Sequence, residues 1–266
     1  MARPDATLYV IPGSHACRAA MLMLEHKRVE YRTIELPTGA HPLLVRALGF
    51  PGSSGPMRTL HDGPHRLLAT LDRLGTVPAL RLDGRRVQTN RAIASHLEQV
   101  RPEPPLYPSD PELLGAVLEA ERWADDTLQM AARRIVLAAS FRGLDELSER
   151  GAAGRLGALL SRNATVRLGA SRMSARTTFR AGAGNERELL DRLPALLDQV
   201  DVWIAAGVLG GDRLYTADMM IAPSLALLAY RNDLRDDIER RPAGELLERV
   251  LPEPSARGTA ERAPSA

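Results

Sequence analysis

The chain has 266 residues, of which 44% are hydrophobic and 26% charged, and its formal net charge is +2. This length suits about two domains with a sizeable core, and the absence of any apolar run near ~18 residues argues against a membrane span. Positive and negative side chains are interspersed without a basic block, which argues against nucleic-acid binding. Cys17 is the single cysteine, so an intramolecular disulfide framework is excluded, and the N-terminus lacks an apolar signal segment. We expect a cytoplasmic protein.

The first hundred residues alternate between strand-like and helix-like patterns. Asp83-Gly84 is a strong hairpin signal, and Ser14 is suited to cap a helix. The order of the pattern is βαβ followed by ββα. The predicted elements are a strand at 7–11, a helix from Ser14 to about His26, strands at 31–36, 77–82 and 85–88, and a helix through Ile93 to Leu97 that Asn90 caps.

A long connection at about 42–75 separates the second predicted strand from the third. It contains the run Gly52-Ser53-Ser54-Gly55-Pro56 and then a helix-like piece around 66–74. Connections longer than about 12–15 residues usually carry structure or function of their own. We therefore expect a surface insertion with one or two short helices and a flexible Gly/Ser segment.

A proline-rich stretch at 101–110 predicts a linker between two domains. Asp110 is suited to cap the next helix, with Pro111 at its first position. From there to residue 251 the apolar spacing is helical throughout, and Met219 to Leu228 is apolar almost all round, which is typical of a central buried helix. The tail at 252–266 has the composition of a disordered segment.

Two chemically capable side chains lie at the start of the first predicted helix. Unpaired N–H groups and a partial positive charge at a helix N-terminus favour an anion, and such a site lowers the pKa of a thiol. From the residues alone, Ser14 is either a helix cap or a hydroxyl that hydrogen-bonds a bound thiolate. Cys17 is either a reactive thiol or a buried and inert one.

Four motifs, in their order along the chain, resemble those of the cytosolic glutathione transferase family, in its theta-like and bacterial branch. The resemblance implies a thioredoxin-like α+β domain over residues 5–100 and an all-α helical domain over 111–251. The matching motifs are Ser14-His15-Ala16-Cys17-Arg18-Ala19, Gly39-Ala40-His41, Val77-Pro78-Ala79-Leu80 and Gln88-Thr89-Asn90-Arg91-Ala92-Ile93.

The resemblance assigns a role to each motif. It implies that the Ser14 hydroxyl stabilises the thiolate of glutathione and that His41 holds the glycyl carboxylate. It also implies a cis bond before Pro78, so that the backbone of Val77 pairs with the tripeptide as an added strand would. Thr89 and Asn90 take the two positions that bind the γ-glutamyl end, which the same resemblance places at the start of a helix.

Thr89 and Asn90 stand where the family has an acidic residue and a serine. The substrate amine therefore lacks its usual partner, and another thiol becomes an alternative. Almost every basic residue is arginine, with Lys27 the only lysine, which is typical of GC-rich coding. Because some GC-rich bacteria use mycothiol, we weigh mycothiol beside glutathione.

The resemblance implies an enzyme that joins a low-molecular-weight thiol to a small electrophile, as a homodimer and without a metal or resident cofactor. One alternative is a catalytically silent binding or regulatory protein of the same fold. Another is a thiol oxidoreductase that depends on Cys17. In the helical half, Tyr215-Thr216-Ala217-Asp218 resembles a structural box of the family, with Thr216 able to cap, and Trp123 is expected to pack rather than bind substrate.

Overall fold

The computed structural model describes residues 6–11, 13–37, 40–52, 76–139, 141, 155–156, 172 and 181–253. The predictions for Gly39, for most of the long connection and for nearly all of the C-terminal tail lie outside these residues. Within them, no helix is both long enough and apolar enough to cross a membrane.

The N-terminal half is built on a mixed sheet of four strands in the order β2-β1-β3-β4. β1 is parallel to β2 and antiparallel to β3, and β3 is antiparallel to β4. Asp83 and Gly84 have φ of 49° and 79°, as the predicted hairpin requires. The strands are β1 (Ala6–Val10), β2 (Tyr31–Glu35), β3 (Ala79–Leu82) and β4 (Arg85–Gln88).

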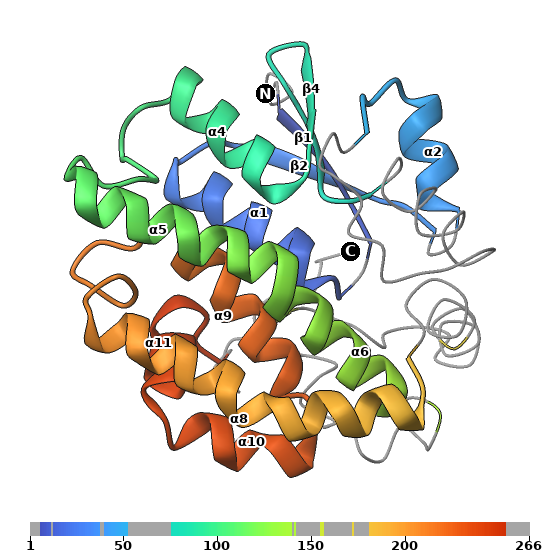
Figure 1. The fold of residues 1–266 in the computed structure, drawn as a ribbon. Coiled ribbons are helices and arrows are strands. Elements are labelled where there is room, and N and C mark those ends of the chain that lie inside the picture. Colours follow the sequence, from blue (N-terminus) through green and yellow to red (C-terminus); the bar gives the residue numbers. More distant parts are fainter. Residues whose placement is uncertain are drawn as a thin grey trace, which may run out of the picture.

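In the described part of this half, three helices accompany the sheet: α1 (His15–His26), α2 (His41–Ala47) and α4 (Asn90–Val100). α1 and α4 pack together, and α2 lies apart from them (Figure 1). α2 occupies the start of the segment expected as an insertion, and Pro42 in its first turn is a favourable helix start. Shortly after α2 in the chain, the Phe50 ring packs edge-on against the Tyr9 ring of β1, with the two ring centroids 5.4 Å apart. This part of the connection therefore belongs to the domain core.

The helical half follows the linker. Its first helix begins at Pro111 as predicted, because the Asp110 carboxylate accepts the Leu113 N–H at 2.8 Å. A π-helical turn, η1, interrupts the continuous rod that α5 and α6 form (Figure 1). The elements are α5 (Pro111–Trp123), η1 (Ala124–Leu128), α6 (Gln129–Ala139), α8 (Ala183–Ala205), α9 (Thr216–Leu228), α10 (Asn232–Glu239) and α11 (Pro242–Val250).

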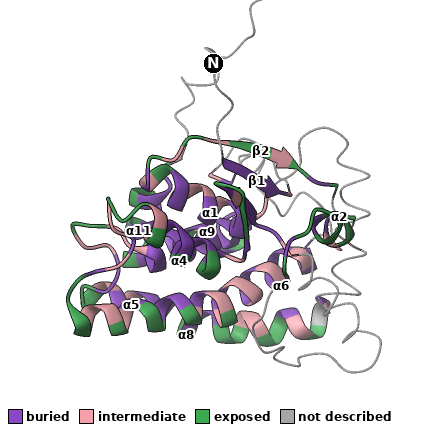
Figure 2. Cartoon of the chain, turned by 90° about the horizontal axis from the view of Figure 1, so that it is seen from above, coloured by how far each residue is buried: buried purple, intermediate pink, exposed green. Residues whose placement is uncertain are grey.

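α9 is the centre of the molecule, since all of its residues are buried (Figure 2). α1, α5, α6 and α11 pack around it, so the two halves share one core. The buried Asp218 carboxylate accepts the N–H groups of Gly210 at 2.7 Å and Tyr215 at 2.8 Å. The alternative that Thr216 caps this helix is wrong, because Thr216 is its first residue and donates its N–H to Leu106.

The linker is held by the only lysine of the chain. The Lys27 side chain is 0% exposed, and its Nζ donates to Glu98 at 2.6 Å and to the Pro102 carbonyl at 3.0 Å. Glu98 also accepts the Leu106 N–H at 2.9 Å. A single ion pair therefore joins α1, α4 and the linker.

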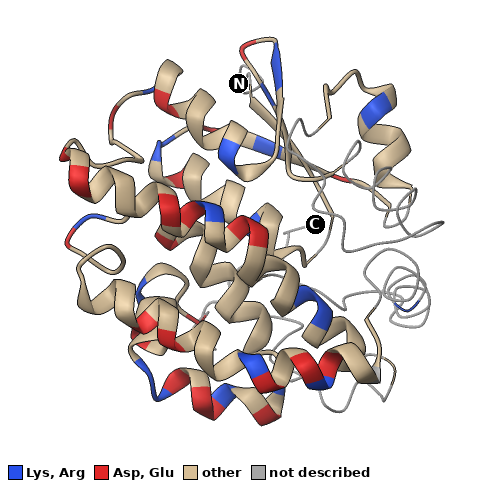
Figure 3. Cartoon of the chain, viewed as in Figure 1, with Lys and Arg blue, Asp and Glu red and all other residues tan. Residues whose placement is uncertain are grey.

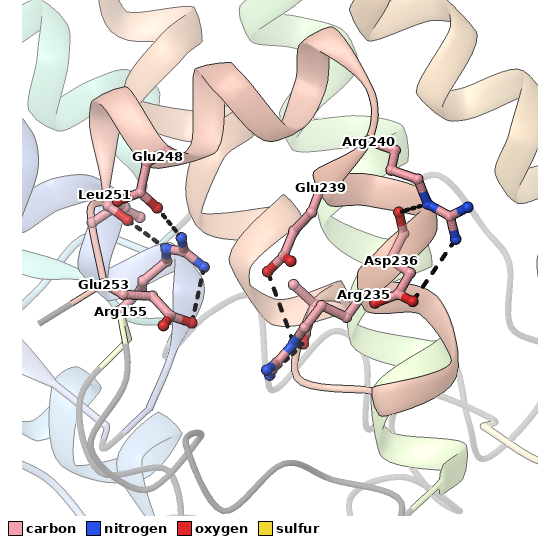
Figure 4. Close-up of polar contacts among 9 residues, drawn as sticks. Arg155, Arg235, Asp236, Glu239, Arg240, Glu248, Leu251 and Glu253 are labelled. Atoms are coloured by element: carbon pink, nitrogen blue, oxygen red, sulfur yellow. Dashed lines mark hydrogen bonds and ion pairs between the residues drawn. The ribbon is translucent and has the colours of Figure 1, made fainter.

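Acidic and basic side chains are interspersed along α8 and α10, whereas α5 carries mainly acidic ones (Figure 3). At the far end of the helical half, Arg155 points at the end of α11 and donates to the Leu251 carbonyl at 2.6 Å (Figure 4). Its guanidinium also pairs with Glu248. A cation at a helix C-terminus is favourable, so this contact stabilises the end of α11.

Candidate functional site

The sheet register brings the sequence motifs to one end of the sheet. Tyr9 of β1 faces Ala79 of β3, and Ala79 faces Gln88 of β4. The loop before α1, the Val77-Pro78 bond and the start of α4 therefore lie side by side. Because β1 and β2 are parallel, the segment after β2 that leads to His41 leaves from the same end. The structure thus gathers segments that are up to about 75 residues apart in the chain.

Ser14 is the N-cap of α1. Its Oγ accepts the Cys17 N–H at 3.3 Å, and the side chain is half-buried. An accepting hydroxyl keeps its own proton, which it can still donate to an anion in front of the helix. Capping and thiolate stabilisation are therefore compatible at this position.

The Val77-Pro78 peptide bond is cis, as the motif implied. The Pro78 carbonyl accepts the Thr89 N–H at 3.2 Å, which joins the cis bond to the start of α4. Val77 is buried and lies two residues before the first residue of β3. Its backbone lies at the end of a strand, where an extended peptide could add to the sheet.

The Gln88 side chain connects two segments beside this bond. Its Nε2 donates to the Thr76 carbonyl at 2.7 Å, and its Oε1 accepts the Gly52 N–H at 2.8 Å. The residue is 3% exposed. Both ends of the amide are therefore occupied, and Gln88 positions the backbone of the site.

The cap of α4 differs from the prediction. Thr89, with φ of 77°, is the N-cap, and its Oγ1 accepts the Ala92 N–H at 3.4 Å. Asn90 is instead the first helical residue. The unusual backbone of Thr89 places the Thr89 side chain over the N-terminal end of α4. Asn90 is 3% exposed, and its Oδ1 has no partner among the described residues. It is therefore a buried acceptor at a helix N-terminus.

A positive field surrounds this end of the sheet. α1 and α4 both direct their N-termini toward it, and such termini favour anions. Burial is the largest influence on two groups here, lowering the pKa of His15 and raising that of Cys17, and the guanidinium charge of Arg133 in α6 acts to lower both. The helical half thus contributes a cation to the region that Ser14 occupies.

Comparison with protein families assigns most of the N-terminal half to a known domain family. A sequence profile described as "Glutathione S-transferase, N-terminal domain" matches residues 8–105. This segment is an N-terminal domain of the glutathione S-transferase family. The match covers every predicted site residue, from Ser14 to Asn90. A comparison with curated protein sequences returned no match.

Solved structures, glutathione S-transferases among them, share the fold of this chain. One from Ceriporiopsis subvermispora, in complex with glutathione, has a TM-score of 0.60 at 18% identity and covers 98% of this chain and 100% of its own. One from Methylobacterium radiotolerans, with glutathione sulfonate, has a TM-score of 0.54 at 17% identity, with coverages of 98% and 95%. The β-etherase LigF from Sphingobium sp. has a TM-score of 0.53 at 16% identity, with coverages of 92% and 99%. At these identities the likeness establishes the fold alone.

In the glutathione S-transferase domain, Cys17 is 2% exposed. Burial raises the pKa of its thiol to about 11, although hydrogen bonding to Ser14 acts in the opposite direction. A nucleophilic cysteine needs an exposed thiolate. This environment therefore argues against a reaction that depends on Cys17.

His41 is the first residue of α2 and is largely buried. It follows the last residue of β2, Glu35, by six residues. Trp123 packs as expected, edge-on against Trp203 with centroids 5.1 Å apart.

One buried carboxylate was not identified from the sequence as a candidate site residue. Glu121 of α5 is 2% exposed, accepts the Tyr107 hydroxyl at 3.0 Å and lies 3.9 Å from the Arg91 guanidinium. Burial raises the pKa of Glu121 to about 7, while Tyr107 and Arg91 oppose the rise. The sequence feature that could have identified Glu121 is its position: an acidic residue lies within the apolar stripe of a helix, on the same face as Val117 and Leu118.

Proposed function

We propose that the protein is a glutathione transferase-like enzyme that conjugates a low-molecular-weight thiol to a small electrophile. The observation that carries the proposal is the convergence of the Ser14 hydroxyl, the cis Val77-Pro78 bond and the start of α4 at one end of the sheet. Each of these features offers one interaction that a thiol-containing tripeptide needs.

The thiolate would lie in front of α1. There the Ser14 O–H donates to the sulfur while the helix N-terminus and the Arg133 charge favour its anionic form. The thiol proton leaves to solvent, and the sulfur attacks an electrophilic carbon held by the helical half. A carbon–sulfur bond forms as the leaving group departs with its electron pair.

The rest of the thiol would bind along the edge formed by β3 and α4. The Val77 backbone would pair with the cysteinyl unit, and His41 would hold the glycyl carboxylate. Thr89 and Asn90 would bind the γ-glutamyl end, where the unpartnered Asn90 Oδ1 is an acceptor for the amine. This acceptor offsets part of the loss of the acidic residue.

Glutathione is the first thiol to test, because two structural neighbours contain glutathione or its sulfonate. Calorimetric titration with glutathione and, separately, with mycothiol measures binding without assuming an electrophile. We expect one thiol to bind and Asn90→Ala to weaken that binding by about tenfold, since a buried polar contact is lost. Failure of both thiols to bind would favour the silent binding protein.

The role of Ser14 is tested by variants that separate capping from donation. Ser14→Asp keeps a good cap but presents an anion that cannot donate, whereas Ser14→Thr keeps both properties. We expect Ser14→Asp to fold and to lose conjugation with a standard aromatic electrophile by about 100-fold or more, and Ser14→Thr to retain most of it. Equal activity in the wild type and in Ser14→Asp would leave Ser14 as a cap only.

A further inference from the structure

One carboxylate of the helical half faces the start of α4. Glu121 lies in α5, and its side chain is 2% exposed. Its Oε1 accepts the Tyr107 hydroxyl of the linker at 3.0 Å, and its Oε2 lies 3.9 Å from the Arg91 Nε of α4. The two oxygens thus face two different segments of the chain. Glu121 is therefore a junction between α5, the linker and the first turn of α4.

The Arg91 side of this junction belongs to the candidate thiol site. Arg91 directly follows Asn90 in the first turn of α4. Its side chain is 46% exposed, and among the described residues Glu121 is the carboxylate within ion-pair distance of it. Thr89 and Asn90, to which the proposed function assigns the γ-glutamyl end of the thiol, lie on the same turn. A contact that fixes Arg91 therefore also fixes the backbone that carries these two side chains.

The contact with the linker does not by itself explain a carboxylate at this position. A glutamine of the same shape would keep the Tyr107 contact, since an amide oxygen also accepts a hydrogen bond. Burying a charged carboxylate costs free energy unless the charge is paired. What a carboxylate adds is attraction for a cation, which here is Arg91. Because an ion pair with a half-exposed arginine adds little stability, its main effect is on where Arg91 lies.

The charge of Glu121 depends on pH near neutrality. Burial raises the pKa of Glu121 to about 7, against the opposing effects of Tyr107 and Arg91. Among the described residues, α9 also packs against α5 but adds no group to those that act on this carboxyl. Those groups are Tyr107 of the linker, Arg91 of α4, Asp125 of η1 and Arg122 of α5 itself. The charged pair with Arg91 therefore forms as the pH rises through about 7 and is lost below it.

We propose that Glu121 is a positioning residue for thiol binding, which acts through Arg91 on the first turn of α4. There it keeps Thr89 and Asn90 in place to meet the γ-glutamyl end of glutathione. The inference rests on the proposed transferase function and deepens it. Because the γ-glutamyl end carries no reacting atom, the contact affects thiol affinity and leaves the bond-forming step unchanged.

The pair can be tested from both of its sides. Glu121→Gln keeps the shape and the Tyr107 contact and removes the charge, whereas Arg91→Met removes the guanidinium from a half-exposed position. The double variant shows whether Glu121 acts through Arg91. Arg122→Met is the matched control, because it removes a cation beside Glu121 whose Nε donates to the Leu118 carbonyl of its own helix at 3.2 Å.

The readouts are the Kd of glutathione and of mycothiol by calorimetry, kcat and the KM for the thiol with a standard aromatic electrophile, and Tm. We expect Glu121→Gln and Arg91→Met each to raise Kd and KM about threefold to fivefold at about pH 8 with kcat unchanged, since a half-exposed ion pair is weak. The double variant should bind no more weakly than Arg91→Met alone, and Arg122→Met should leave Kd unchanged. At about pH 6, where Glu121 is protonated, the wild type and Glu121→Gln should bind the thiol equally.

The failure of this inference and the failure of the proposed function give different results. If the wild type binds a thiol and Glu121→Gln binds it equally at both pH values, the positioning role is overturned and the transferase function stands. The role is also overturned if the difference between the two proteins is the same at both pH values, if Glu121→Gln weakens binding further in the Arg91→Met background, or if Arg122→Met weakens it as much as Arg91→Met. If the wild type binds neither glutathione nor mycothiol, the transferase function fails, and the inference that rests on it fails too.

Discussion

The amide of Gln88 offers a direct test of how the candidate site is held together. Replacing it by Leu keeps the approximate volume of the side chain and removes both of its hydrogen bonds, to Thr76 at 2.7 Å and to Gly52 at 2.8 Å. Because Thr76 directly precedes Val77, the loss should loosen the cis bond segment as well as the fold.

The size of the effect follows from the two contacts. A hydrogen bond contributes about 1 kcal/mol net, and a buried partner left unpaired costs about 1–3 kcal/mol. Gly52 and Thr76 are half-buried, so water can replace part of each interaction. We therefore expect the free energy of unfolding to fall by about 2–4 kcal/mol, which corresponds to a Tm lower by roughly 5–15 °C.

Urea unfolding followed by circular dichroism measures this loss, and Gln88→Glu is the matched control. The carboxylate of this Glu variant can accept the Gly52 N–H. At high pH, however, its second oxygen faces the Thr76 carbonyl oxygen, and two acceptors repel each other. Protonation restores a donor, so the pKa of the new carboxyl should be raised and the variant should be more stable at about pH 5 than at about pH 8. The reasoning is refuted if Gln88→Leu unfolds at the urea concentration of the wild type, or if the Glu variant shows no added pH dependence.

Two further predictions concern buried titratable groups. Cys17 should react with iodoacetamide at least roughly 100-fold more slowly in the native protein than in urea, because it is buried and the pKa of its thiol is raised to about 11; comparable rates would show an exposed thiolate. Glu121 has a folded-state pKa raised from 4.5 to about 7, so it stabilises the fold below pH 4.5 and this contribution is lost as the pH rises through 7. Wild type should therefore lose up to about 3 kcal/mol relative to Glu121→Gln between about pH 5 and pH 8, measured by urea midpoints; parallel curves for the two proteins would contradict this.

Local signals predicted much of the fold. Ser14 and Asp110 have side chains that cap a helix within three residues, and the Asp83-Gly84 pair has the backbone freedom that a hairpin turn needs. These features depend on neighbours in the chain, so the sequence alone shows them. The β1–α1–β2 and β3–β4–α4 order followed directly from them.

Other features depend on contacts between distant segments. Thr89 rather than Asn90 caps α4 because the Thr89 backbone adopts a positive φ, which a β-branched residue rarely does without tertiary support. The buried Glu186 pairs with Arg231, which lies 45 residues further along the chain, and no periodic pattern shows such a pairing.

The burial of Lys27 gives the folded protein an unusual reactivity. It is the only lysine in the sequence, and its amine is enclosed between Glu98 and the Pro102 carbonyl. Reagents selective for amines should therefore leave the side chains of the native protein unmodified. Labelling at Lys27 would then occur only when the linker detaches from α1 and α4, so its rate would report how often the linker opens.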